Sequence, residues 1–348
     1  MNKVRTRFWG ILLVVVLLLS LLPATALAAE NVSYVDEYNE SRTRESATEV
    51  ETSTTAWGTA GSQTWYVVTD NVEIADRITV IGDVHLILAD GYTLNAKKGI
   101  YVGSGNSLTI YGQSQGTGTL TAKATQLARY AGIGGNKDGE AAHGNITING
   151  GIITAESVGD AAAIGSGNEN KAYGTTNGTI TINGGSVTAK GGSNGAGIGG
   201  GYFNKITGGA IVINGGTVNA TGGAKAAGIG SGFSDQQENG RSITISGGTV
   251  TATGGEDAAG IGGGFGCKAA SITRITINGT ADVTANGGTK GAGIGSGFST
   301  AMTTSINIGG DAVVKAKGGD DESYGAAGIG SGGGTDSKIG DISISGGN

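Results

Sequence analysis

The sequence is poor in the residues that usually brace or interrupt a fold. It has one cysteine, Cys267, and one proline, Pro23, among 348 residues. A single cysteine excludes an intramolecular disulfide, so stability has to come from packing and backbone hydrogen bonds. The only histidines are His85, in an expected strand, and His143, in an expected loop. We interpret them as two unrelated surface residues rather than as a metal or catalytic pair.

Motifs that carry chemistry are equally scarce. The patterns HExxH, CxxC and GGxGxD do not occur in the sequence. Residues 195–200 satisfy the dinucleotide pattern GxGxxG, but the same glycines recur throughout the chain and open no helix. We therefore predict no cofactor, no metal site and no catalytic residue. Cys267 is interpreted as a small buried side chain rather than a nucleophile.

Charge is low, and its sign limits the partners. The chain has 22 basic and 28 acidic residues, which gives a net charge of −6. Removal of residues 1–28 would take away three of the basic residues. A mature chain of about −9 argues against a nucleic-acid partner. Residues 1–28 combine basic MNKVRTR, an apolar run from Phe8 to Leu22 and an ALA site, the pattern of a signal peptide. Its 15 apolar residues fall short of the ~20 needed for a membrane span. We predict export to the cell surface or medium, with no membrane association after cleavage.

Glycine, in contrast, is abundant, with 71 residues. The segment GGTVTATGGEDAAGIGGGF at 247–265 returns with small changes at 184–202, 215–233 and 279–298. Glycine-rich composition alone would suit a disordered chain. The regular spacing and the β-branched residues between the glycines favour a folded repeat protein instead.

Two markers share one period. Successive isoleucines are 31 to 36 residues apart in both series. The ITIN-like marker gives Ile146, Ile180, Ile211, Ile243, Ile275, Ile306 and Ile342, and the AGIG marker gives Ile133, Ile164, Ile198, Ile229, Ile261, Ile294 and Ile329.

Each repeat holds three short alternating runs, such as 243–245, 249–253 and 259–262, separated by glycines. Three strands per ~32-residue coil predict an all-β fold, a right-handed parallel β-helix or β-solenoid. A propeller blade would need four strands and about 40–50 residues. Alternation directs Ile243 and Ile245 inward and Thr244 outward.

Columns of equivalent residues are expected to stack from coil to coil. One corner holds Asn149, Asn183, Asn214 and Asn278, with Ser246 once, and predicts an asparagine ladder with a left-handed backbone at the turn. Four residues before the AGIG isoleucine, opposite or neutral groups alternate: Asp160, Asn194, Lys225, Asp257 and Lys290.

The chain divides into four parts. After the signal peptide, residues 29–60 are expected to form an acidic linker. Residues 61–145 are expected to form an N-terminal cap with irregular first coils, because an open β-helix end would template aggregation. Regular repeats occupy 146–348. The sequence ends one strand into a new coil, which predicts that the protein continues beyond residue 348.

The segments WYVV, DVHLILADGYTLNA and GIYVGSGNSLTIYGQSQGTGTLTA, followed by recurrent ITINGG and AGIGSG, resemble secreted cell-surface β-helix proteins of Gram-positive bacteria. The resemblance covers residues 60–348. It implies a pectate-lyase-like fold and a carbohydrate-binding or adhesive role, and it defines no ligand residue that can be transferred.

Two outward columns are candidates for a binding surface. Gly197, Gly228, Gly260, Gly293 and Gly328 predict a side-chain-free trough, and Tyr202, Phe233, Phe265 and Phe298 predict a row of rings beside it. The rings either stack on one another or form a platform for the faces of sugar units in a polysaccharide or cell-surface glycan.

Three alternatives to a glycan-binding surface protein remain open. A polysaccharide lyase or hydrolase would need scattered acids, such as Asp160, Asp257 and Asp282, to gather around a base. A purely structural stalk would need no ligand. Ice binding is a remote third possibility, because Glu156 and Lys190 interrupt the regular threonine face.

Overall fold

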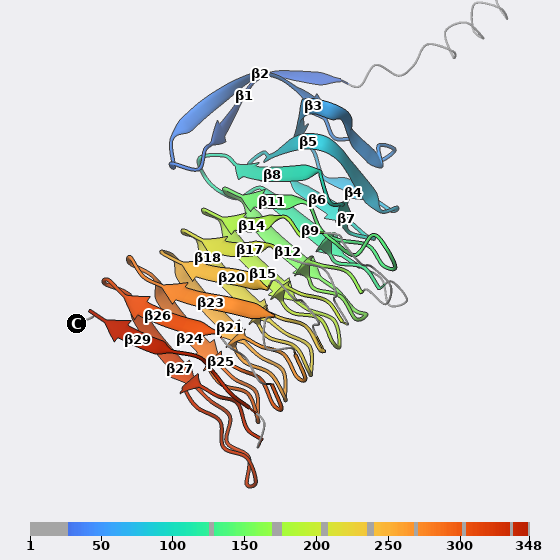
Figure 1. Ribbon diagram of the computed structural model, residues 1–348. Helices are drawn as coiled ribbons and strands as arrows, with labels where there is room; N and C mark the ends of the chain where they lie inside the picture. Colours follow the sequence, from blue (N-terminus) through green and yellow to red (C-terminus); the bar gives the residue numbers. More distant parts are fainter. Residues whose placement is uncertain are drawn as a thin grey trace, which may run out of the picture.

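The computed structural model describes residues 27–124, 129–168, 176–202, 208–234, 240–267, 271–300, 304–334 and 337–346. The predicted signal peptide lies almost entirely outside these ranges. Within these ranges all helices and strands assigned are β-strands, and no helix suited to cross a membrane is found. The strands stack into a right-handed parallel β-helix, which confirms the predicted fold class (Figure 1).

Each regular coil contributes one strand to each of three columns, named here after their sequence markers. The AGIG column contains β7 (Ile100–Val102), β10 (Ile133–Gly134), β13 (Ile164–Gly165), β16 (Ile198–Gly199), β19 (Ile229–Gly230), β22 (Ile261–Gly262), β25 (Ile294–Gly295) and β28 (Ile329–Gly330). The ITIN column contains β8 (Ser107–Gly112), β11 (Asn145–Ile148), β14 (Thr179–Ile182), β17 (Ala210–Ile213), β20 (Arg241–Ile245), β23 (Ile272–Ile277), β26 (Ser305–Gly309) and β29 (Ile342–Ser345). The VTA column contains β4 (Val72–Ile74), β6 (Thr93–Ala96), β9 (Thr119–Lys123), β12 (Ile152–Glu156), β15 (Ser186–Lys190), β18 (Thr217–Thr221), β21 (Thr249–Thr253), β24 (Asp282–Asn286) and β27 (Val313–Lys317).

The coils stack in the register that the two markers predict. Ile146 pairs with Ile180, and the pairing continues through every later marker to Ile342. The AGIG isoleucines pair in the same way from Ile133 to Ile329. Each residue therefore lies beside its own counterpart in the neighbouring coil.

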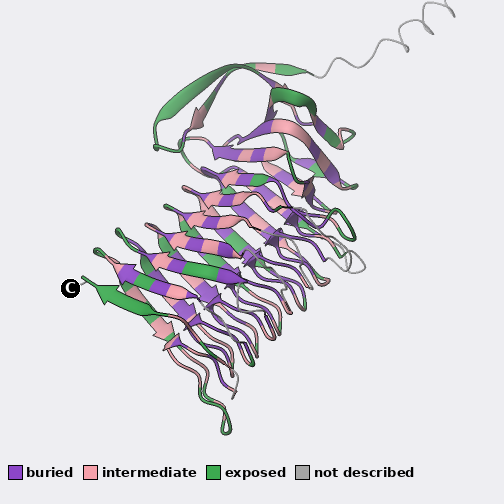
Figure 2. Cartoon of the chain, viewed as in Figure 1, coloured by how far each residue is buried: buried purple, intermediate pink, exposed green. Residues whose placement is uncertain are grey.

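The core is a thin column of Ile, Val, Leu and Ala inside the coils. Ile243, Ile245 and Val250 are fully buried, whereas Thr244 between the first two is partly exposed. The same alternation of buried and less buried residues runs along the strands in Figure 2. The predicted inward and outward positions are confirmed.

Glycine is required at the end of each AGIG strand. From Gly134 to Gly330 this glycine has a φ of 131° to 140°, a conformation that side chains oppose. A Cβ atom built on Gly262 would lie 2.0 Å from the carbonyl oxygen of Gly295 in the next coil. Any larger residue would push neighbouring coils apart, which is one reason for the glycine content.

The asparagine ladder is present, with one correction. Nδ2 of Asn183 donates to Oδ1 of Asn149 at 2.8 Å, and Nδ2 of Asn214 donates to Oδ1 of Asn183 at 2.8 Å. The left-handed residue of the turn is the second following glycine, such as Gly185 at φ 80°, and not the asparagine. The next coil continues the ladder through Ser246. After Asn278 the positive φ comes one residue early, at Gly279, and no side-chain hydrogen bond joins Asn278 to the ladder.

The expected acidic linker is wrong, because residues 29–60 contain strands. β1 (Ala28–Val35) and β2 (Ser41–Glu49) form an antiparallel hairpin that arches over the N-terminal end of the stack (Figure 1). Val32 and Ala47 pack with Trp65, Ile87 and Tyr111 in a second hydrophobic cluster on the outside of the β-helix. Most of the acidic and basic side chains of the hairpin are exposed, with Asp36 buried at its tip, and these charges gave the segment its linker-like composition.

The first coils are longer-stranded than the later ones. β3 (Ala56–Val68) pairs with β2 and β5, and β5 (Ile78–Leu88) pairs with both β7 and β8. The single strand β5 therefore lies next to both the AGIG column and the ITIN column. From β7 onward all three columns are present, so the regular three-strand coil begins near residue 100 rather than at 146.

The inward and outward assignment can be tested with one pair of substitutions in a single coil. Ile261→Asp places an unpaired carboxylate in the thin core and is expected to lower the free energy of unfolding by several kcal/mol, on the order of 3 or more. Thr244→Asp, on the outer face, is expected to change it by less than about 1 kcal/mol. Urea denaturation followed by circular dichroism measures both values. Equal tolerance of the two variants would contradict the assignment.

Candidate functional site

The four predicted ring residues lie in one column, beyond the AGIG strands and before the loops that lead to the ITIN strands. Tyr202 and Phe233 have ring centroids 5.1 Å apart, Phe233 and Phe265 5.4 Å, and Phe265 and Phe298 5.8 Å, with interplanar angles of 13° to 28°. Tyr324 closes the column edge-on against Phe298 at 5.3 Å. We call Tyr202, Phe233, Phe265 and Phe298 the aromatic ladder.

The backbone holds each ladder residue in place. The amide N–H of Phe233 donates to the carbonyl of Asn194 in the preceding coil at 2.9 Å, and Phe265 donates in the same way to Lys225 at 3.0 Å. The spacing of the rings is therefore the spacing of the coils. Stacked rings are each half-buried, and their neighbours cover their faces, so that mainly edges meet the solvent.

A polar column runs directly beside the aromatic ladder, built from Asp160, Asn194, Lys225, Asp257 and Lys290. Asn194 donates from Nδ2 to Asp160 at 2.8 Å, and Lys290 forms an ion pair with Asp257 at 3.3 Å. Nζ of Lys225 lies 4.7 Å from the ring centroid of Phe233 and 5.4 Å from that of Phe265. The predicted alternation of charge is confirmed for the two contacting pairs, and the cations also cover part of the ladder.

The prediction of a side-chain-free trough is wrong. Gly197, Gly228, Gly260 and Gly293 are buried, and Gly328 is partly buried. A Cβ on Gly260 would meet the backbone nitrogen and oxygen of Asn286 at 2.8 Å. These glycines are present because the following coil presses against them, so they contribute no open surface beside the ladder.

A family model of the β-helix repeat matches five segments of the chain, 146–168, 180–202, 211–233, 243–265 and 275–298. The match agrees with the parallel β-helix described above. Each of the last four segments ends on a residue of the aromatic ladder, which makes the ring position part of the repeat itself. Searches of curated proteins and of solved structures return no match to this chain.

The acidic residues of this β-helix protein do not gather. Among the residues that the structure describes, no group of three or more His, Cys, Asp or Glu side chains is placed to hold a metal ion. Asp282 is exposed on β24, whereas Asp160 and Asp257 belong to the polar column. Cys267 is buried, as expected, and its thiol donates to the carbonyl of Gly232 at 3.2 Å.

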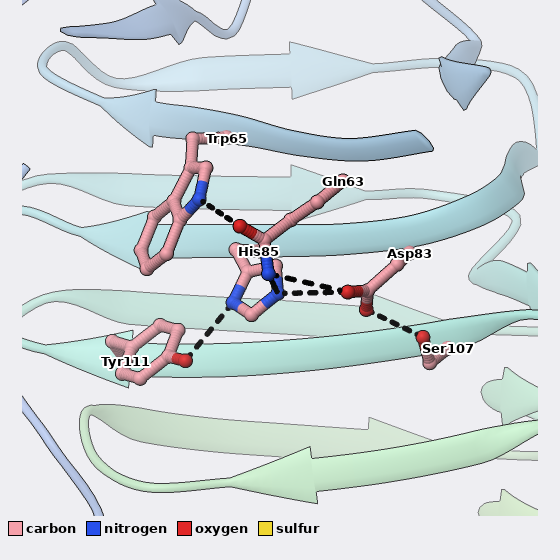
Figure 3. A network of polar contacts seen from close by, with 6 residues as sticks. All are labelled: Gln63, Trp65, Asp83, His85, Ser107 and Tyr111. Carbon is pink, nitrogen blue, oxygen red and sulfur yellow. Dashed lines mark hydrogen bonds and ion pairs between the residues drawn. The ribbon is translucent and has the colours of Figure 1, made fainter. Parts of the chain in front are cut away.

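A polar and aromatic network that the sequence did not indicate lies beneath the hairpin (Figure 3). The His85 ring stacks on Trp65 at 4.3 Å, and its Nδ1 lies 2.9 Å from the hydroxyl of Tyr111. Its Nε2 lies 3.2 Å from Asp83, which also accepts a hydrogen bond from Ser107 at 2.6 Å. Burial opposes ionisation of Asp83, but the hydrogen bonds from Ser107 and His85 outweigh it and lower the pKa of this carboxyl.

This network is part of the packing between the hairpin and the first coils. Tyr34 of β1 covers both Trp65 and Tyr111, with centroid distances of 5.2 and 4.8 Å. Burial raises the pKa of Tyr111, so its phenol is neutral and serves as a hydrogen-bonding group. His85 is only 9% exposed, which corrects its assignment to the surface.

His143 is also buried, at 2% exposure, in the turn that precedes β11. Its amide N–H donates to Oδ1 of Asn177, and its Nδ1 lies 2.8 Å from the carbonyl of Gly144. Burial lowers the pKa of His143 to about 4, the hydrogen bond to Gly144 opposes that change, and the charge of Arg241 adds to it. The ring is therefore neutral at neutral pH.

This burial predicts a pH dependence of stability. The folded-state pKa of about 4 lies below the ordinary value of 6.5, so the unfolded chain binds the proton more readily. Stability is complete above pH 6.5 and is lost as the pH falls towards 4, by about 3 kcal/mol in total. Denaturation measured between pH 7 and pH 5.5 tests this, because the ordinary pKa values of Asp and Glu, about 3.9 and 4.3, lie more than one pH unit below this window. His143→Gln is expected to flatten the profile, and a parent protein of constant stability in this window would contradict the assignment.

Proposed function

We propose that the protein is exported and that its β-helix is an elongated, rigid surface that binds extended glycans at the cell exterior. The observation that carries the proposal is the aromatic ladder with the polar column beside it. Together they form a strip along the helix axis that offers ring edges and hydrogen-bonding groups once per coil. A linear polymer of repeating sugar units suits a surface that repeats in the same direction.

The contact differs from a stack of sugar faces on open ring faces. Inside the aromatic ladder each ring face is occupied by the next ring, so Phe233 and Phe265 present edges to a ligand. The hydroxyl groups of a glycan would bind the amide and charged groups of the polar column, such as Asn194, Lys225 and Asp257. Each contact is weak, and affinity would come from several coils acting on one polymer.

Ring stacking also favours a second candidate function, a structural stalk. In the aromatic ladder the ring faces pack against one another, and this stacking stabilises neighbouring coils whether or not a ligand is present. A stalk would keep the rings for stability alone. The two functions differ in whether the outer ring edges take part in binding.

Paired substitutions in the aromatic ladder separate these functions. Phe233→Leu with Phe265→Leu removes two ring edges, and is expected to weaken glycan binding about tenfold. Phe233→Tyr with Phe265→Tyr keeps the stacked rings, as Tyr202 does in this column, and is expected to retain binding. A glycan array followed by titration of the strongest hit measures the effect on variants that circular dichroism shows to be folded. A parent that binds no glycan, or a folded leucine variant that binds as the parent does, would favour the stalk.

A further inference from the structure

The asparagine ladder has a direction and an open end. Every donor in it points towards the preceding coil: the hydroxyl of Ser246 donates to Asn214, and the side-chain amides donate from Asn214 to Asn183 and from Asn183 to Asn149. Asn149 is the first member, and its Oδ1 is taken by Asn183. Its Nδ2 has no hydrogen-bond partner among the described residues, although the residue is only 7% exposed. A chain of hydrogen bonds polarises its members, which strengthens the terminal Nδ2 as a donor.

This open end faces a cavity of about 230 Å³. The cavity lies between the tip of the β1–β2 hairpin, the turn after β8 and the corners that follow β11 and β14. The hairpin contributes Asp36 and Glu37, the turn contributes Gln113, and the corners contribute Asn149 and Asn183. Val35, Asn39, Ser114 and Gln115 also line the cavity, and glycines at 112, 116, 150, 151, 184 and 185 leave the rest of the wall without side chains.

The hairpin tip is held in place over this cavity. Asp36 accepts hydrogen bonds from the amides of Tyr38 and Glu40 and an ion pair from Arg42 at 2.7 Å. Nε2 of Gln113 donates to the carbonyl of Ser33 at 2.9 Å and ties the turn after β8 to β1. The walls of the cavity are therefore connected by hydrogen bonds within the chain, and Glu37 is exposed at its mouth.

The groups of the cavity select the chemistry of a ligand. The terminal Nδ2 of Asn149 can donate a hydrogen bond to a ligand, whereas the carboxylate of Glu37 can accept one. An anion would be repelled by Asp36 and Glu37, and a cation would leave the Asn149 donor unsatisfied. A neutral hydroxyl compound supplies both roles. The volume is below the roughly 300–1,000 Å³ of sites for larger ligands, which suits a single sugar ring.

We propose that this cavity binds one neutral monosaccharide unit, whose hydroxyl oxygen accepts from Nδ2 of Asn149 and whose hydroxyl protons are donated to Glu37. The site lies after the ITIN strands, whereas the aromatic ladder precedes them, and the inference does not rest on glycan binding by the ladder. The β1–β2 hairpin, which was predicted to be a linker, supplies the acidic residues Asp36 and Glu37 of the cavity wall.

The test uses two matched substitutions in the asparagine ladder. Asn149→Asp keeps an oxygen for the Nδ2 of Asn183 but removes the free donor, and is expected to weaken monosaccharide binding at least tenfold with little loss of stability. Asn214→Asp breaks the hydrogen bond to Asn183 outside the cavity, and is expected to cost stability and, because it only shortens the chain of hydrogen bonds, to weaken binding less than Asn149→Asp does. Saturation-transfer NMR with glucose, galactose and N-acetylglucosamine measures binding to the purified chain, and urea denaturation measures stability.

A second pair tests the acidic wall. Glu37→Gln is expected to weaken binding several-fold, and Glu40→Gln, on the same hairpin but outside the cavity lining, to leave it unchanged. The proposal is overturned if the parent binds none of the three sugars, or if Asn149→Asp binds as the parent does. A parent that binds polymers through the aromatic ladder but no free monosaccharide would overturn this inference alone. Loss of polymer binding with retained monosaccharide binding would overturn only the proposed function.

Discussion

Hydrogen bonding between successive coils is the constraint on which the rest of this structure depends. Parallel strands in register place every residue beside its counterpart in the next coil, about 4.8 Å away. Each position must therefore accommodate a copy of itself as a neighbour. Isoleucine meets this requirement inside the column, since Ile243, Ile275 and their equivalents pack into one continuous core. Where a carbonyl of the next coil comes within about 2 Å of an ideal Cβ position, as at Gly262, only glycine meets it.

The same requirement sorts the polar and aromatic residues. Side-chain amides satisfy one another, which suits the corner of Asn149, Asn183 and Asn214. Rings stack, as in the aromatic ladder. Like charges at this spacing would repel, so Asp257 faces Lys290 in the polar column. The surface of the β-helix is thus a set of ladders, each of which is stable because its members interact with their own kind or with an opposite charge.

Much of the fold could be predicted from the sequence, because in a stacked repeat each residue contacts the equivalent residue of the next repeat. Two isoleucine series with one period were enough for the fold class, the register and the buried positions. The trough at Gly260 could not be predicted correctly, since a missing side chain looks the same whether the space is open or filled by Asn286. The hairpin was missed because it occurs once and its exposed charges outnumber Val32 and Ala47, the residues that it buries. His85 is flanked by Trp65 and Tyr111, and Tyr34 of the hairpin packs on both of these rings, so the burial of His85 was missed together with the hairpin.

The candidate sites follow from where a ladder is left incomplete. Within a ladder, each donor or ring face is already used by the next coil, so the interior has little to offer a ligand except edges. The first member is different, because the coil before it lacks the matching residue. The counterpart of Asn149 in the preceding coil is Tyr111 rather than another asparagine, and the amide keeps a donor that no side chain of the ladder uses. An element outside the repeat is needed to enclose such an end, and the β1–β2 hairpin is that element. In this β-helix protein the regular coils therefore supply length and rigidity, and the irregular N-terminal part supplies a polar cavity that is open on one side.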